Sequence, residues 1–354
     1  MAADAGTRVG RLDLVRRRPA VAAAVGVAGL ALVLVASVAF GPVWIAPADT
    51  IAIIAHRVFD WPVHVAWAAT SETIVMELRL PRALSAMAVG ASLALAGAAL
   101  QGLLRNPLAD PYVLGTASGA ALGAAIGVLL PIRGVLFGFG LVQALAFAGA
   151  LIAVTLVWNL SRSGTLGSLT GLLLTGYAVS SLLAAGLAVT MYLAGSDLRE
   201  IVFFLLGGLS GASWQQLWSA LPLMAIGAIV ILGRTRALNG LLLGEETASH
   251  LGMDVGRERA ILLAAASLVT AAAVSIAGLV GFVGLVVPHV VRLLVGPNAR
   301  FVLPLAALFG ASFLAASDLL ARVLGEIPVG VLTALVGAPF FLSVLRRTRE
   351  GYEL

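Results

Sequence analysis

Apolar runs of about the length of a membrane crossing recur along almost the whole chain, separated by short segments that hold the charged residues. A helix needs roughly 20 apolar residues to cross about 30 Å of hydrocarbon. Ten windows of about this size lie at approximately residues 20–40, 83–104, 112–131, 134–160, 168–195, 215–233, 260–278, 281–296, 301–321 and 329–345. The pattern predicts an all-α, polytopic membrane protein with about ten transmembrane helices in a single domain, residues 1–354.

Several interruptions in the apolar pattern refine this prediction. The run after the basic tail, residues 1–19, is longer than the core of a cleaved signal peptide, about 7 to 15 residues, so we interpret it as the first transmembrane helix. The uncharged stretch from Ala260 exceeds one crossing, and Gly278, Gly281 and Gly284 predict a break within it. Segments two to five and seven to ten resemble each other weakly, which predicts an inverted repeat.

Composition excludes a soluble globule, since 60% of the residues are hydrophobic and only 11% are charged, against roughly 25% in an ordinary domain. The sequence has no cysteine, which excludes a disulfide framework, a thiolate metal site and iron–sulfur chemistry. It also has no lysine, so the nucleotide-binding loop GxxxxGK[ST] is missing. We therefore expect any ATP hydrolysis to occur in a separate subunit.

The positions of the arginines predict the orientation of the chain. With the N-terminus inside and ten crossings, 16 of the 22 arginines fall in cytoplasmic segments and six fall outside. This distribution agrees with the positive-inside rule and argues against nucleic-acid binding. The six outside are Arg57, Arg79, Arg82, Arg133, Arg199 and Arg322.

The sequence shows no catalytic constellation and no metal-ligand cluster. His289 is interpreted as a structural histidine, and Asp318 and Arg322 are spaced to form an ion pair on one helix face. Ionisable residues are scarce inside the predicted spans, whereas ion-coupled carriers usually need them near the midplane. Secondary transport is therefore the alternative hypothesis, and a membrane enzyme ranks third.

Two cytoplasmic segments interrupt the helices in ways that allow a structural or a functional interpretation. Arg105 to Pro111 must turn because of its two prolines, and it is either an ordinary connection or part of a gate. The longest cytoplasmic segment, residues 234–259, contains a short helix ended by glycine. Its leucines and alanine face either a partner or the membrane domain, and amphipathicity does not choose between them.

Five motifs in this order resemble the permease subunits of type II ABC importers, the FecCD-like or BtuC-like family that carries iron–siderophore complexes, haem and cobalamin. They are Leu78-Arg79-Leu80-Pro81-Arg82, the run Gly97 to Gly119 with Asn-Pro-Leu-Ala-Asp-Pro, the run Gly278 to Arg292 with Pro288-His289, Asp318 to Arg322, and Glu326 to Gly330. The resemblance covers nearly the whole chain.

The resemblance implies a homodimer in the bacterial inner membrane, with two ATPase subunits on the inside and a soluble substrate-binding protein on the outside. ATP and Mg²⁺ would be used by the ATPase, and the permease itself would bind no cofactor. The cargo would be an iron chelate such as a ferric siderophore or haem, which overall likeness favours, or cobalamin.

The resemblance also implies roles for particular residues. ATPase coupling corresponds to Leu243, Gly244, Glu245, Ala248, Leu251 and Gly252. Docking of the binding protein corresponds to Arg79, Arg82 and Arg322 at an exposed outer rim. The cytoplasmic gate corresponds to Asn106, Leu108, Ser168 and Thr170, of which the last two match weakly.

Overall fold

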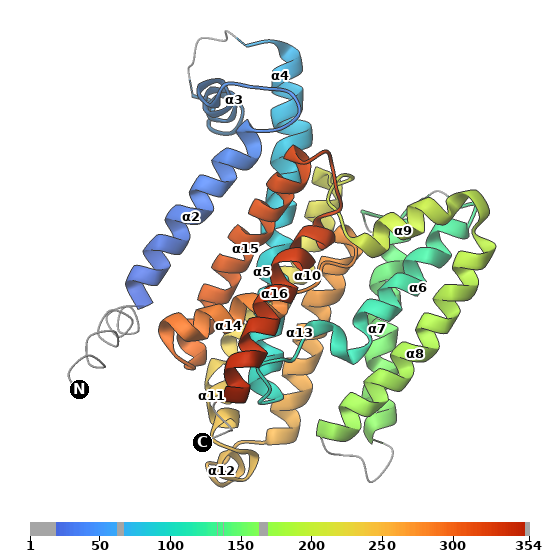
Figure 1. Cartoon of the computed structure of the whole chain (residues 1–354), viewed down its shortest axis with the longest axis vertical. Coiled ribbons are helices and arrows are strands. Elements are labelled where there is room, and N and C mark those ends of the chain that lie inside the picture. The colour runs from blue at the N-terminus through green and yellow to red at the C-terminus, as the bar shows by residue number, and fades with distance from the viewer. Residues whose placement is uncertain (1–18, 62–66, 133, 137, 163–168, 351–354) are drawn as a thin grey trace.

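The computed structural model describes residues 19–61, 67–132, 134–136, 138–162 and 169–350, and most of these residues are helical (Figure 1). Seven helices in this part of the chain are long and apolar enough to cross a membrane, and three shorter apolar helices accompany them. In chain order they are α2 (Pro19–Ala39), α5 (Leu80–Leu103), α6 (Thr116–Leu129), α7 (Leu141–Arg162), α8 (Leu169–Leu193), α10 (Trp214–Gly233), α13 (Val255–Ala277), α14 (Val283–Val295), α15 (Ala299–Val323) and α16 (Val329–Glu350). The prediction of an all-α polytopic membrane protein is confirmed.

The second transmembrane helix begins well before its predicted start at residue 83. Helix α4 (Ala69–Thr73) and the π-helical turn η1 (Ile74–Arg79) lead directly into α5, giving one helix of 35 residues. Pro81 has no N–H to donate, and at this point the Leu80 N–H bonds the carbonyl of Val75, five residues back. A helix of this length is roughly 50 Å long, so part of it projects beyond the hydrocarbon.

The predicted span over residues 134–160 is also too long at its start. Strands β1 (Val135–Leu136) and β2 (Phe139–Gly140) pair antiparallel before α7 begins at Leu141. Gly138 has a φ of 84°, which the hairpin turn requires and which glycine adopts without a steric penalty. Apolar residues therefore continue through this hairpin without forming a helix.

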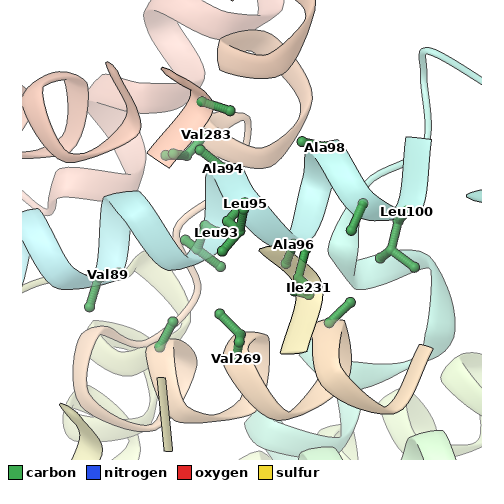
Figure 2. Packing of buried hydrophobic residues seen from close by; sticks show 14 of the residues in the cluster. Val89, Leu93, Ala94, Leu95, Ala96, Ala98, Leu100, Ile231, Val269 and Val283 are labelled. Carbon is green, nitrogen blue, oxygen red and sulfur yellow. The ribbon is translucent and has the colours of Figure 1, made fainter. Parts of the chain in front are cut away.

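Helix α5 is buried along nearly all of its length. Figure 2 shows apolar residues of its middle part, such as Leu93 and Leu95, packed among neighbouring helices. Helix α5 packs against α13, α14 and α15. A Cβ at Gly90 would lie 2.2 Å from the Gly310 oxygen, and one at Gly97 would lie 1.9 Å from the Gly284 oxygen. These contacts confirm that small residues allow close approach of backbones in the interior.

The predicted break in the long apolar stretch is present between α13 and α14. Helix α13 ends at Ala277, Gly278 has a φ of 65°, and α14 begins at Val283. Phe282 has a φ of 68°, which is uncommon for a residue with a side chain. The break leaves the backbone groups of Val280 outside any helix, so that they bond a side chain of another element.

Short elements mark the two ends of the bundle (Figure 1). The outer end is formed by α3 (Pro47–Phe59), α4, the hairpin, η3 (Gly195–Asp197) and α9 (Leu198–Leu206). The inner end is formed by α11 (Thr235–Leu242) and α12 (Glu245–His250), and the turn η2 (Pro111–Leu114) precedes α6. The apolar run Ile201–Leu206 belongs to α9, which is too short to span.

Candidate functional site

The inner-end segment α11–α12 presents large apolar side chains to the surface, above all those of Leu243 and Leu251. Leu243 is 66% exposed and Leu251 is 72% exposed, and they flank α12. Gly244, between α11 and α12, has a φ of 115°, and Gly252, just after α12, has a φ of 82°. The two leucines are thus available for contact with a partner.

Ala248, the other apolar coupling candidate, is fully buried. Helix α12 turns this residue onto the body of the protein, unlike the two leucines, and its part in coupling stays a prediction. A charged side chain at Ala248 would have to be buried, which is costly. Ala248 therefore supports α12 from below.

Glu245 connects α12 to two other parts of the inner end. Its Oε1 accepts a hydrogen bond from Arg259 near the start of α13, and Arg105 Nη2 lies 3.4 Å from the same oxygen. Arg105 follows α5 and has a φ of 48°. One carboxylate therefore joins the coupling segment, the Asn-Pro loop and α13.

The loop from Arg105 to Pro111 is held by its own side chains. Asn106 Oδ1 accepts from the Leu108 N–H at 2.9 Å, and Asp110 Oδ1 accepts from the Tyr112 N–H at 2.8 Å, which caps η2. Burial raises the pKa of Asp110, while the hydrogen bond from Tyr112 opposes that rise. Asp110 thus caps the short turn before the third span, and Asn106 stabilises the loop itself.

Tyr112 links this loop to the break between α13 and α14. Its hydroxyl donates to the Val280 carbonyl at 2.9 Å and accepts from the Val280 N–H at 3.1 Å. Both backbone groups of Val280 are therefore satisfied by one side chain. Tyr112 therefore holds the Asn-Pro loop against the break between α13 and α14.

The predicted gate is only partly visible. Asn106 is exposed and Leu108 is half-buried, both in the loop just described. Ser168 lies outside the described residues, and only the backbone of Thr170 is described, within α8. The gate assignment stays a prediction.

Arg292 is half-buried at the inner end, on α14. Its guanidinium donates to Gln101 Oε1 and, at 3.4 Å, to the Ala98 carbonyl. Gln101 Nε2 in turn donates to the carbonyls of Gly284 and Leu285 at 3.1 and 3.2 Å. This network ties α14 to α5 through neutral acceptors.

At the outer end, Arg79 binds the last carbonyls of α2. Its guanidinium donates to Val38 at 3.0 Å, to Ala39 at 2.6 Å and to Val43. An arginine in this position satisfies carbonyls that the helix end leaves unpaired and complements its dipole. The side chain is buried and anchors the outer end of α2.

Asp318 is the centre of a second outer cluster, with its side chain 1% exposed. Arg82 Nη2 lies 3.0 Å from its Oδ1 and Arg322 Nε lies 3.2 Å from its Oδ2, which confirms the predicted pair of Asp318 and Arg322. Arg82 also binds Glu326 at 2.9 Å, and Arg322 donates to the Ser37 carbonyl at 2.8 Å.

These contacts correct the prediction of an exposed arginine rim. Arg79 and Arg322 are buried with internal partners, so neither presents its charge at the surface of the chain. Arg82 is the most accessible of the three, and its partner Glu326 is 45% exposed. Both line an open outer cavity of about 510 Å³ together with Glu200 and Gln216.

Comparison with known proteins places the chain in a family. The model of the FecCD transport family matches residues 29–347, so the chain belongs to this family of ABC importer permeases. It is a multi-pass membrane protein and a transport permease subunit.

Curated relatives and a solved structure agree with this assignment. The chain is 47% identical over 301 residues to the cobalamin import system permease protein BtuC of Halobacterium salinarum, covering 85% of this chain and 79% of that protein. It is 42% identical to the hemin transport system permease protein HmuU of Yersinia pestis, covering 78% and 84%. A solved inward-facing conformation of a metal-chelate type ABC transporter matches with a TM-score of 0.78 and 30% identity, covering 91% and 97%.

Sequence reasoning missed several residues that join the site. Tyr112 and Glu326 carried no periodic signal, and their partners lie 168 and 244 residues away. The Asp-Pro-Tyr order is a partial signal, because aspartate is a preferred capping residue at the start of a helix. The double contact of Glu245 became visible only when α5, α12 and α13 were placed together.

Proposed function

We propose that this chain is the permease subunit of an ATP-driven importer of a metal chelate, either cobalamin or an iron chelate such as haem. The observation that carries the proposal is the family match over residues 29–347. Relatives with 47% and 42% identity are named for cobalamin and for hemin, so both cargo types are retained.

The working complex, in this proposal, contains two copies of the chain in the cytoplasmic membrane. Two ATPase subunits bind the inner face, where they use ATP and Mg²⁺, and a soluble substrate-binding protein docks on the outer face. Membrane lipid surrounds the apolar helices, of which α2, α7 and α8 are mostly exposed in the single chain. The chain itself holds no cofactor and performs no hydrolysis.

Leu243 and Leu251 are the proposed contacts with the ATPase. Both are exposed apolar side chains at the inner end, where a partner would bury them favourably. Glu245 then passes the movement of α12 to Arg105 and the Asn-Pro loop. Ala248 and the two glycines, Gly244 and Gly252, fix the shape of the segment.

The proposal is tested by reconstituting the full chain with its genomic ATPase and binding protein in proteoliposomes. Labelled cobalamin, haem and a ferric siderophore are supplied with ATP inside the vesicles, or with a non-hydrolysable analogue as control. ATP-dependent accumulation of one cargo supports the proposal. Accumulation driven by an ion gradient without the ATPase would instead establish secondary transport.

A further inference from the structure

A cavity of about 220 Å³ opens at the inner end between four helices, α5, α11, α14 and α15. Most of its wall is apolar, from side chains that include Leu238, Leu242, Val302 and Leu303. Arg105 and Arg292 line it from different elements, and no carboxylate is among its lining residues. A hollow with two arginines and no carboxylate in a mostly apolar wall has the chemistry of an anion site.

The charges around the cavity are not balanced within the described part of the chain. No carboxylate there forms an ion pair with Arg292, whose acceptors are a side-chain amide and a backbone carbonyl. Arg105 shares its partner Glu245 with Arg259. Arg105 and Arg259 thus share one carboxylate, Arg292 has none, and a partly buried charge without a counter-ion is costly.

The donors that face the cavity are side chains and not the start of α15. The N–H of Ala299 donates to Asn239 and that of Arg300 donates to Asn298, at 2.8 and 3.0 Å. These amides are already satisfied, so an anion would be held by the guanidinium groups. Planar guanidinium groups bind phosphate oxygens in pairs.

We propose that this inner cavity binds a phosphate group between Arg105 and Arg292. The phosphate group is either free phosphate or the headgroup phosphate of an anionic phospholipid. In the second case the apolar wall contacts the apolar part of the lipid. Basic pockets between helices on the cytoplasmic side of membrane proteins bind such headgroups. Because Arg105 also contacts Glu245, occupancy would set the position of the Asn-Pro loop.

The experiment measures the thermal unfolding midpoint of the purified full chain in two arms. In the first, delipidated protein in neutral detergent is titrated with sodium phosphate, against sodium chloride at matched ionic strength. In the second, nanodiscs of phosphatidylcholine are compared with nanodiscs that also contain phosphatidylglycerol. The variants are Arg105→Gln, Arg292→Gln and, as the matched control, Arg300→Gln, an exposed arginine at the same end that does not line the cavity.

We expect phosphate or phosphatidylglycerol to raise the midpoint of the wild type and of Arg300→Gln. In Arg105→Gln and Arg292→Gln the half-saturating concentration should rise roughly tenfold or more, because one charge-assisted contact is lost. A response in the first arm identifies free phosphate as sufficient, and a response in the second arm alone identifies the lipid headgroup.

No rise in either arm would overturn the proposal, as would equal responses of Arg105→Gln and Arg300→Gln. If Arg292→Gln does not fold, Arg105→Gln decides the question, because Arg105 is 37% exposed and tolerates replacement more readily. The test does not depend on transport activity and so stands apart from the proposed function.

Discussion

The arginines at the two ends of the bundle have different kinds of partner. At the outer end Arg79 is satisfied by carbonyls of α2 and its C-terminal extension, and Arg82 and Arg322 share Asp318. At the inner end Arg105 and Arg259 share Glu245, and Arg292 contacts no carboxylate in the described part of the chain.

The difference shows that the outer arginines hold helices together, whereas the inner arginines of the described chain keep charge that is free to meet a partner. Buried ion pairs that are well surrounded by hydrogen bonds hold elements in place, and removing one partner is far more harmful than removing the pair. The outer cluster therefore fixes α2 against α15. The inner end keeps Arg292 without a carboxylate partner in the described chain, and exposed leucines that include Leu243 and Leu251, as expected of a surface that meets partners.

The largest expected effect is at Asp318. Asp318→Asn would leave Arg82 and Arg322 without their shared carboxylate, and we expect a loss of about 3–5 kcal/mol in the free energy of unfolding. Denaturant unfolding of the full chain in mixed micelles measures this loss. Glu326→Gln is the matched control, since its exposed pair with Arg82 should be worth about 1 kcal/mol or less. Equal losses in the two variants would contradict the clamp at the outer end.

The second effect is on coupling at the inner end. Leu243→Glu and Leu251→Glu should lower ATP-driven uptake roughly tenfold or more, because each would place a charge in an apolar contact with the ATPase. Their unfolding midpoints should stay near that of the wild type, since both side chains are exposed. Ala248→Glu should instead destabilise the chain itself. Undiminished uptake by both leucine variants would show that the ATPase binds elsewhere.

A smaller effect is expected at Glu245. Glu245→Gln removes the shared partner of Arg105 and Arg259, while Glu246→Gln removes an exposed neighbour that forms no ion pair in the described chain. These pairs are partly exposed, so the change in uptake per ATP should be about two- to fivefold for Glu245→Gln and near zero for Glu246→Gln. The ratio of uptake to hydrolysis in proteoliposomes measures it. Equal ratios would mean that Glu245 does not connect α12 to the loop.

The sequence predicted the helices well because apolar length alone determines which segments can cross a membrane. It failed where an apolar run does not form a helix, as in the Val135–Gly140 hairpin, and where a polar segment extends a helix, as in α4. The glycine break after Ala277 was predicted because it depends on local backbone conformation.

Burial of the arginines could not be predicted in the same way. The partners of Arg79 lie about 40 residues away and those of Arg82 more than 230 residues away, so their contacts depend on how the helices pack. A position outside the membrane does not imply exposure to solvent, as the burial of Arg79 and Arg322 shows. Asp318 and Arg322 were paired correctly because they are one helical turn apart.

The smallest expected effect concerns docking of the binding protein, which we propose to involve Arg82. Arg82 Nη1 is bound to Glu326, so a carboxylate of the binding protein would compete with Glu326 for this guanidinium. Glu326→Gln should therefore strengthen docking, by up to about fivefold given the usual size of an exposed ion pair. Glu200→Gln, which removes another carboxylate from the same outer cavity, is the matched control and should change the affinity less. Affinity is measured between the binding protein and the full chain in nanodiscs at several salt concentrations, and screening should weaken docking as salt rises. Weaker docking by Glu326→Gln, with no dependence on salt, would show that Arg82 serves only the outer cluster.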